Sequence, residues 1–251
     1  MTVNINHQPI YYEERGEGPA VLLLHGWGVD CSLFRPLMQL LSKQYRALAL
    51  DFPGFGQSPE PPEPWCVDHY ADLALAFLQA LGISSCILLG HSFGGRVAIK
   101  LCARQLPSPV FPKVILVDAA GVKPTPTKQA VRRAKRYQIG KQLLTPFPKL
   151  MERWRDRHGS ADYKAASPMM REVLKRTVSE DLTPLFPLVK PPVLLIWGRG
   201  DTATPLSDGQ LMERQMPNAG LAVLEQAGHF SFLEQQPQFL RVIASFLRIE
   251  P

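Results

Sequence analysis

A chain of 251 residues is long enough to bury the core of one α/β domain and to carry an inserted segment. Hydrophobic residues make up 45% of the chain and charged residues 20%, which is typical of a globular protein and argues against a disordered one. No apolar run is long enough to cross a bilayer and no signal peptide is visible, so we expect a cytoplasmic protein. The four cysteines lack metal-site spacing, and we expect no metal or organic cofactor.

The net charge of +6 is concentrated in one part of the chain. Residues 122–190 contain 16 Lys and Arg against 6 Asp and Glu, whereas the rest of the chain contains 12 against 16. A basic segment inside an otherwise weakly acidic chain indicates a region that differs in kind from its surroundings.

Short apolar runs bounded by turn residues predict the strands. They lie at residues 2–14 (two strands with a turn near 7–9), 20–25, 45–50, 86–89, 113–118, 193–197 and 221–224. Apolar residues at helical spacing predict helices between most of these strands. The helices lie at 32–43, capped by Ser32, at 67–81, closed by Gly82, directly after residue 94, at 206–216, and over a final segment to about 247. This alternation predicts an α/β fold with a parallel, doubly wound sheet.

The alternation of strand and helix patterns is interrupted between residues 121 and 192. Helical patterns punctuated by prolines occupy this segment at about 127–144, 148–157 and 169–178. Long structureless loops are uncommon in compact domains, so we expect an inserted helical cap. The predicted division is a core of residues 1–121 and 191–251 and a cap of residues 122–190.

The segment Gly90-His91-Ser92-Phe93-Gly94 follows a buried strand directly and precedes a helix. It has the G-x-S-x-G pattern of a nucleophile elbow, in which a sharp strand-to-helix turn presents a serine hydroxyl at the top of a sheet. The two glycines leave room for the crowding at such a bend. We therefore predict that Ser92 is a catalytic nucleophile.

A serine nucleophile needs a base, and the base needs an orienting acid. His229 lies in a loop after the last predicted strand, and Asp201 lies in a loop directly after the strand at 193–197. Loops at the carboxyl ends of parallel strands share one crevice, so these side chains are expected to meet. The order Ser92, Asp201, His229 is the one expected for a nucleophile elbow, with Asp118 as the alternative acid.

Two backbone N–H groups are expected to form an oxyanion hole. One is that of Phe93, directly after the nucleophile, and the other is that of Trp27 in the glycine-rich loop after the strand at 20–25. The side chains of both residues are also candidates to line the substrate pocket. His25 and His91 are expected to hold the flanking loops, and Asp51 to brace its own loop.

These motifs resemble those of the α/β-hydrolase superfamily over nearly the whole chain outside residues 122–190. The resemblance rests on His25-Gly26-Trp27-Gly28, Asp51-Phe52-Pro53-Gly54-Phe55-Gly56-Gln57-Ser58, Gly90-His91-Ser92-Phe93-Gly94-Gly95 and Gly228-His229. It implies an eight-stranded, mostly parallel sheet with a helical cap between the sixth and seventh strands. It argues against haloalkane dehalogenases and epoxide hydrolases, which carry Asp where this chain has Ser92. Ring-cleavage carbon–carbon hydrolases usually have S-x-N-M-G-G at the elbow, from which this chain departs.

The predicted cap contains candidates for two kinds of contact. Apolar residues in it are either cap core or the lining of an acyl pocket: Met151, Trp154, Met169 and Met170. Its basic residues form solvated helix faces or a docking surface for an acidic carrier protein: Arg132, Arg133, Lys135, Arg136, Arg153, Arg155 and Arg157. The docking interpretation follows a similarity to pimeloyl-carrier-protein methyl esterases, which have an H-G-W-G loop and a basic cap. The basic residues lack stacking aromatics interleaved in an RNA-binding pattern, so nucleic acid is not an expected partner.

The sequence therefore predicts a serine hydrolase that cleaves small to medium, partly apolar carboxylic esters through an acyl-enzyme. The first alternative is a thioesterase or carrier-protein methyl esterase recruited through the cap. The second alternative is a non-catalytic receptor that keeps the pocket, because receptors of this fold can retain all three triad residues.

Overall fold

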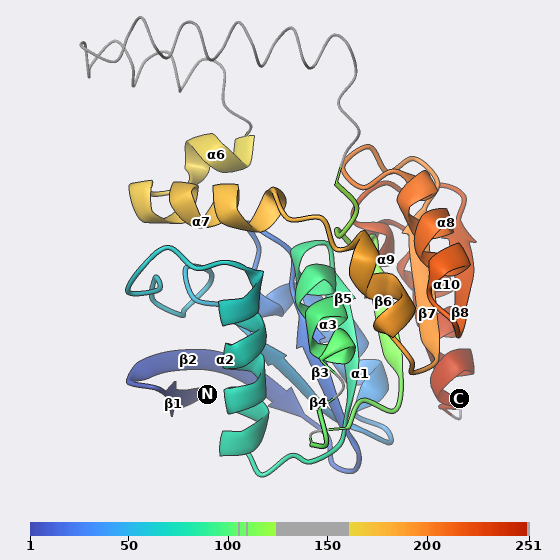
Figure 1. The fold of residues 1–251 in the computed structure, drawn as a ribbon. Helices are drawn as coiled ribbons and strands as arrows, with labels where there is room; N and C mark the ends of the chain where they lie inside the picture. Colours follow the sequence, from blue (N-terminus) through green and yellow to red (C-terminus); the bar gives the residue numbers. More distant parts are fainter. Residues whose placement is uncertain (105, 109, 124–160, 250–251) are drawn as a thin grey trace, which may run out of the picture.

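The computed structural model describes residues 1–104, 106–108, 110–123 and 161–249 (Figure 1). The described residues form one eight-stranded sheet in the order β1-β2-β4-β3-β5-β6-β7-β8. The strands are β1 (Thr2–Ile5), β2 (Gln8–Arg15), β3 (Ala20–Leu24), β4 (Arg46–Leu50), β5 (Cys86–His91), β6 (Val114–Val117), β7 (Val193–Gly198) and β8 (Ala219–Leu224). Strands β1 and β2 pair antiparallel, as do β2 and β4, and every later pair is parallel. The predicted fold class is confirmed.

Helices cover both faces of the sheet. They are α1 (Arg35–Leu41), α2 (Val67–Ala80), α3 (Phe93–Ala103), α6 (Ala161–Ala165), α7 (Pro168–Val178), α8 (Leu206–Gln215), α9 (Ser231–Glu234) and α10 (Gln236–Leu247), with 3-10 turns η1 (Cys31–Phe34) and η2 (Thr183–Leu188). The short helices α6 and α9 and the turn η2 were not predicted. The longer helix predicted at 169–178 is α7, and those predicted at 127–144 and 148–157 lie outside the described residues. No described helix is both long and apolar enough to cross a membrane.

The two faces of the sheet carry separate hydrophobic clusters because side chains alternate along each strand. In β3, Leu22 and Leu24 point into the cluster beneath α2, α3 and α8, whereas Val21 and Leu23 point into the cluster beneath α1 and α10. All five residues of β3 are buried. Such strands are apolar without a break because helices cover both of their sides.

The helix predicted to begin at Ser32 begins differently. Ser32 lies inside the turn η1, and its N–H donates to the side chain of Asp30 at 2.9 Å. A carboxylate at the N-cap accepts from a free backbone donor of the first turn, as a serine hydroxyl would. The prediction of Ser32 as the cap was therefore wrong by two residues.

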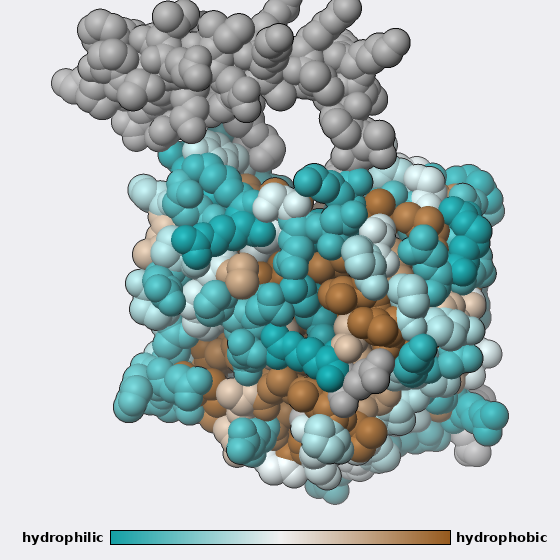
Figure 2. Space-filling view, viewed as in Figure 1, coloured by the Kyte–Doolittle hydropathy of each residue, from teal (hydrophilic) through white to brown (hydrophobic). Residues whose placement is uncertain are grey.

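Helix α7 lies above the carboxyl ends of the parallel strands (Figure 1). Ser167 caps it by accepting from the Met170 N–H at 3.1 Å. Its inward face is buried through Met170, Val173 and Leu174, and hydrophilic side chains predominate on the outside of α6 and α7 (Figure 2). The division of the chain into core and cap at residues 122 and 190 stays a prediction.

Candidate active site

Ser92 lies at a strained turn between β5 and α3. Its backbone has φ 50 and ψ −111, a left-handed conformation that costs a non-glycine residue about 1–3 kcal/mol. The neighbouring glycines allow the turn to pack tightly. A Cβ at Gly90 would lie 2.4 Å from the Gly94 carbonyl oxygen, and a Cβ at Gly94 would lie 2.0 Å from the Leu24 carbonyl oxygen.

Ser92, His229 and Asp201 form a continuous chain of hydrogen bonds, although they lie far apart in the sequence. His229 Nε2 lies 2.9 Å from Ser92 Oγ, and His229 Nδ1 lies 2.8 Å from Asp201 Oδ2. Asp201 follows β7 directly, and His229 lies between β8 and α9. The carboxyl ends of the parallel strands thus place all three side chains in one crevice.

The Asp201 carboxylate is held in its charged form by hydrogen bonds. Oδ1 accepts from the N–H groups of Ala203 at 2.8 Å and Thr204 at 3.0 Å, and Oδ2 also accepts from the Thr204 hydroxyl at 2.7 Å. Burial by itself raises the pKa of Asp201, but the hydrogen bonds from His229 and Thr204 outweigh it, and the pKa lies below its ordinary value. The imidazole therefore faces a carboxylate that stays ionised.

Asp201 in turn sets the titration of His229. Burial lowers the pKa of His229, but the hydrogen bond and the negative charge of Asp201 outweigh it and raise the pKa above its ordinary value of 6.5. The neutral ring carries its proton on Nδ1, which donates to Asp201, and Nε2 is then free to accept from the Ser92 hydroxyl. This is the tautomer that a general base for Ser92 requires.

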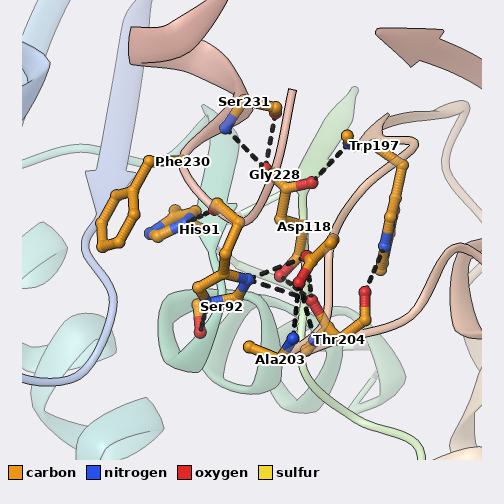
Figure 3. A network of polar contacts seen from close by, with 12 residues as sticks. His91, Ser92, Asp118, Trp197, Ala203, Thr204, Gly228, Phe230 and Ser231 are labelled. Atoms are coloured by element: carbon orange, nitrogen blue, oxygen red, sulfur yellow. Dashed lines mark hydrogen bonds and ion pairs between the residues drawn. The ribbon is translucent and has the colours of Figure 1, made fainter. Parts of the chain in front are cut away.

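Asp118, the alternative acid, is directed elsewhere (Figure 3). Its Oδ1 accepts from the Gly198 N–H at 2.8 Å, and its Oδ2 accepts from the Ser231 hydroxyl at 2.5 Å. Burial raises the pKa of Asp118 to about 7. Among the described contacts, the His229 ring nitrogens meet Asp201, Thr204 and Ser92 and not Asp118. Asp118 joins the ends of β6 and β7 to α9.

Two further histidines hold the loops around the serine. His25 Nε2 accepts from the Phe52 N–H at 2.9 Å, and His25 Nδ1 donates to the Gly26 carbonyl at 2.7 Å. His91 Nε2 donates to the His229 carbonyl at 2.9 Å. Burial lowers the pKa of His91 to about 3, so this ring stays neutral. Each imidazole thus connects its own loop to a backbone segment that is distant in the sequence.

Trp27 and Phe93, the expected oxyanion-hole residues, both line the cavity at Ser92. Their rings meet edge to face, with centroids 5.8 Å apart. Gly26 allows this loop to approach the elbow, because a Cβ there would lie 3.3 Å from Ser92 Cβ and 2.8 Å from His91 Nδ1. Their role as oxyanion donors stays a prediction.

A cavity of about 340 Å³ opens at Ser92 and His229. Helix α7, which lies in the region predicted as a cap, contributes Leu174, Thr177 and Val178 to the wall of this cavity. A second hollow, of about 530 Å³, lies along α10 and contains no residue of the hydrogen-bonded chain. Within the described part of the chain, no cluster of three His, Cys, Asp or Glu side chains is placed to hold a metal ion.

A family model described as the alpha/beta hydrolase family matches residues 21–242. The chain belongs to this family. This alpha/beta hydrolase is 28% identical to the AB hydrolase superfamily protein YisY of Bacillus subtilis, and the match covers 96% of each chain. It is 27% identical to the pimeloyl-(acyl-carrier protein) methyl ester esterase of Aeromonas hydrophila, over 94% of this chain and 98% of the relative.

Solved structures show the same fold. The enol-lactonase from Burkholderia xenovorans matches this alpha/beta hydrolase with a TM-score of 0.77 and 23% identity, over 99% of this chain and all of that one (100%). An esterase from Exiguobacterium antarcticum matches with a TM-score of 0.77 and 22% identity, over 99% of both chains. These likenesses establish the architecture of the hydrolase and not its substrate.

Met169 and Met170, two of the residues predicted as pocket lining, are not among the described lining residues of the cavity at Ser92. Met170 is buried beside Gly54, where a Cβ would come within 2.4 Å of the Met170 sulfur. Met169 is half-buried and, like Met170, is not among the described residues that line the cavity at Ser92. The cavity is lined from one to two turns further along α7, because the first turn of the helix packs onto the core. Met151, Trp154 and the seven basic residues of the predicted docking surface lie outside the described residues.

Thr204 and Arg96 are among the cavity residues that the sequence analysis did not predict. Thr204 donates to the Asp201 carboxylate or to the Asp118 carbonyl, which lies 2.9 Å from its hydroxyl. Arg96 lies on the same helix as the elbow and lines the cavity. A helical spacing of four from Ser92 was the available signal for Arg96, whereas no local pattern marks Thr204.

Proposed function

We propose that this chain is a serine hydrolase that cleaves small to medium, partly apolar carboxylic esters through an acyl-enzyme. The observation that carries the proposal is the chain of contacts from Ser92 through His229 to Asp201, at 2.9 and 2.8 Å. The similarity to relatives named as esterases supports the same reaction class. The proposal favours an enzyme over a non-catalytic receptor of the same fold.

In the first half-reaction, Ser92 Oγ attacks the ester carbonyl carbon while its proton passes to His229 Nε2. The carbonyl oxygen becomes an oxyanion, which the backbone N–H groups of Trp27 and Phe93 stabilise. When the tetrahedral intermediate collapses, the ester C–O bond breaks and His229 returns the proton to the leaving alcohol. Asp201 keeps the imidazole oriented and stabilises its charge.

In the second half-reaction, a water molecule replaces the alcohol. His229 removes a proton from this water, which attacks the acyl carbon and forms a second tetrahedral intermediate. The bond to Ser92 Oγ then breaks, the carboxylic acid leaves, and the serine recovers its proton from His229. The cavity of about 340 Å³ sets the size of the acyl group that this cycle accepts.

Labelling with a fluorophosphonate tests the nucleophile. We expect the wild-type protein to be labelled on Ser92 and to hydrolyse 4-nitrophenyl esters of short acyl chains. Ser92→Ala is expected to abolish labelling and to lower kcat about 10⁵–10⁶-fold, because the residual rate comes only from binding and the oxyanion hole. Ser58→Ala, a buried serine away from the cavity, serves as the matched control. Absence of both labelling and turnover in the wild type would contradict the enzyme and favour the receptor.

A carrier-protein methyl esterase is the second candidate. Several similar relatives bear that name, and residues 122–190 carry the excess of Lys and Arg. An acidic carrier protein is expected to bind more weakly as salt rises, because exposed charge pairs are screened. Charge reversal at Arg132 and Arg133 is expected to remove this binding while hydrolysis of a nitrophenyl ester continues. No binding at low salt, measured by calorimetry, would eliminate this candidate.

A further inference from the structure

A buried arginine lies in the wall of the cavity, beside the serine. Arg96 is 5% exposed and lines the same cavity as Ser92 and His229. It follows Ser92 by four residues on α3, so it lies on the same face of the helix, about 6 Å further along the axis. The Cα–Cβ bonds of a helix lean toward its N-terminus, so the Arg96 side chain leaves α3 on the side of Ser92.

Arg96 lacks a carboxylate partner among the described residues. Its Nη1 donates to the backbone carbonyl of Glu180 at 2.8 Å, and this is the one hydrogen bond that the described residues provide. A guanidinium has five N–H donors, and this contact uses one of them. The carboxylate of Glu180 pairs instead with Lys100, one turn further along α3, at 2.5 Å.

The environment disfavours the charge that Arg96 carries. Burial lowers the pKa of Arg96 below its ordinary value, even though the nearby charges of Glu180 and Asp181 favour the ionised form. Buried charges are rarely left without a partner, because removing a charge from water is costly. A cavity-lining cation that no described carboxylate binds directly is a candidate to bind an anionic group of a ligand.

We propose that Arg96 is a specificity residue that binds a carboxylate on the ester substrate. This inference rests on the proposed function, because it places the ester carbonyl at Ser92 and the anionic group one helical turn away. The guanidinium fork accepts a carboxylate in two parallel hydrogen bonds. The preferred substrates are then half-esters of small dicarboxylic acids, or esters whose alcohol bears the carboxylate.

The other charged residues described in the cavity wall are two carboxylates. Asp162, at the exposed start of α6, and Asp208, near the start of α8, also line the cavity. Asp162 lies on the side of Gly28, where a Cβ would be 4.0 Å from its Oδ1. Both carboxylates repel an anion, and Arg96 is the one Lys or Arg among the described lining residues. A preference for cationic esters would be the opposite result.

Matched esters test the proposal. The 4-nitrophenyl half-ester of glutaric acid and 4-nitrophenyl pentanoate have the same carbon chain and differ by a terminal carboxylate. We expect the wild type to prefer the half-ester by about 10- to 100-fold in kcat/KM, which is the range for one charge-assisted contact. A second pair places the carboxylate on the alcohol: the propionyl ester of 4-hydroxybutyrate and butyl propionate. A preference in either pair supports the proposal and shows which side of the ester carries the anion.

Variants assign the preference to the guanidinium. Arg96→Gln is expected to bring the ratio of the two kcat/KM values close to 1, and Arg96→Lys to retain part of the preference because it keeps a charge without the fork. Lys113→Gln removes a cation outside the cavity whose Nζ donates to the Phe246 carbonyl, and it is expected to leave the ratio unchanged. If Arg96 served only to bind α3 to the Glu180 carbonyl, its variants would lower thermal stability and would lower kcat/KM for both esters by the same factor. That result would overturn the proposal.

Fluorophosphonate labelling distinguishes a failure of the proposed function from a failure of the inference about Arg96. Absence of labelling in the wild type would overturn the proposed function itself. Normal labelling with no anion preference, or with a preference that survives in Arg96→Gln, would overturn the inference alone. Should Arg96→Gln fail to fold, Arg96→Lys decides, and protection of Ser92 from labelling by free glutarate gives a second readout. Glutarate is expected to protect the wild type at lower concentration than it protects Arg96→Lys.

Discussion

The pKa values of two neighbouring carboxylates, Asp201 and Asp118, are shifted in opposite directions by their surroundings. Hydrogen bonds from His229 and Thr204 overcome burial and hold the pKa of Asp201 below its ordinary value. Burial dominates at Asp118 and raises its pKa to about 7. Separated titration of adjacent groups is typical of sites in which one group is charged for catalysis and the other supports the structure. In the proposed mechanism Asp201 has the charged role, because it faces the imidazole.

The pH dependence of activity follows from the His229–Asp201 pair. His229 must be neutral to accept the Ser92 proton, so kcat/KM is expected to rise with pH through the pKa of His229, above 6.5. Asp201→Asn removes the charge that raises this pKa, and the rise is expected to move to lower pH. The same variant is expected to lower kcat about 10⁴-fold, because the ring loses its orientation. Rates measured from pH 5 to 9 check both effects. If the rise of kcat/KM with pH occurred at the same pH in the variant as in the wild type, its assignment to the His229–Asp201 pair would be contradicted.

At the scale of elements, the strand–elbow–helix unit depends on close backbone contacts. Gly94 packs onto β3 so tightly that a Cβ would lie 2.0 Å from the Leu24 carbonyl oxygen. That contact keeps α3 against the parallel strands and thereby positions Ser92 beside the loop of Trp27. The glycine is required by space here, since backbone oxygen cannot move aside as a flexible side chain can.

Gly94→Ala is therefore expected to lower the free energy of unfolding by about 1–3 kcal/mol, the typical cost of overpacking. Gly220→Ala in β8 is the matched control, because a Cβ there meets nothing within 4 Å. The control is expected to be neutral or stabilising by about 0.5–1 kcal/mol, since alanine restricts the unfolded chain. Urea denaturation measures both, and equal effects would contradict the steric explanation.

At the scale of the whole molecule, the buried Asp118 makes global stability depend on pH. Its pKa is about 7 in the folded protein against an ordinary value of 3.8, so the unfolded chain releases this proton first as pH rises. Where the folded state binds more protons, stability falls with increasing pH. Asp118 therefore contributes stability below about pH 4 that is lost progressively up to about pH 7.

Asp118→Asn tests this contribution because it keeps the shape and removes the titration. The difference in unfolding free energy, wild type minus variant, is expected to decrease as pH rises from about 4 to about 7. Subtraction cancels Asp201, whose lowered pKa acts in the opposite direction, since its stabilisation is lost as pH falls. Urea unfolding at several pH values measures the difference, and a constant difference would show that Asp118 titrates normally.

Local patterns were sufficient for the architecture. Apolar runs such as residues 20–25 predicted the parallel strands, because a strand covered on both faces cannot carry polar side chains. Gly90 and Gly94 marked the elbow, because only glycine tolerates such backbone proximity. The order of Ser92, Asp201 and His229 along the chain, together with parallel strands, already predicted that their loops share one edge.

Only the tertiary structure decided where individual side chains point. It directs Asp118 toward Ser231, buries Met170 against Gly54, and places Thr204 beneath the carboxylate of Asp201. It also brings Arg96 into the cavity without a carboxylate partner among the described residues. Strand and helix periodicity is a property of neighbouring residues and can be read along the chain. The direction of a buried side chain depends on packing between distant segments, which no local pattern records.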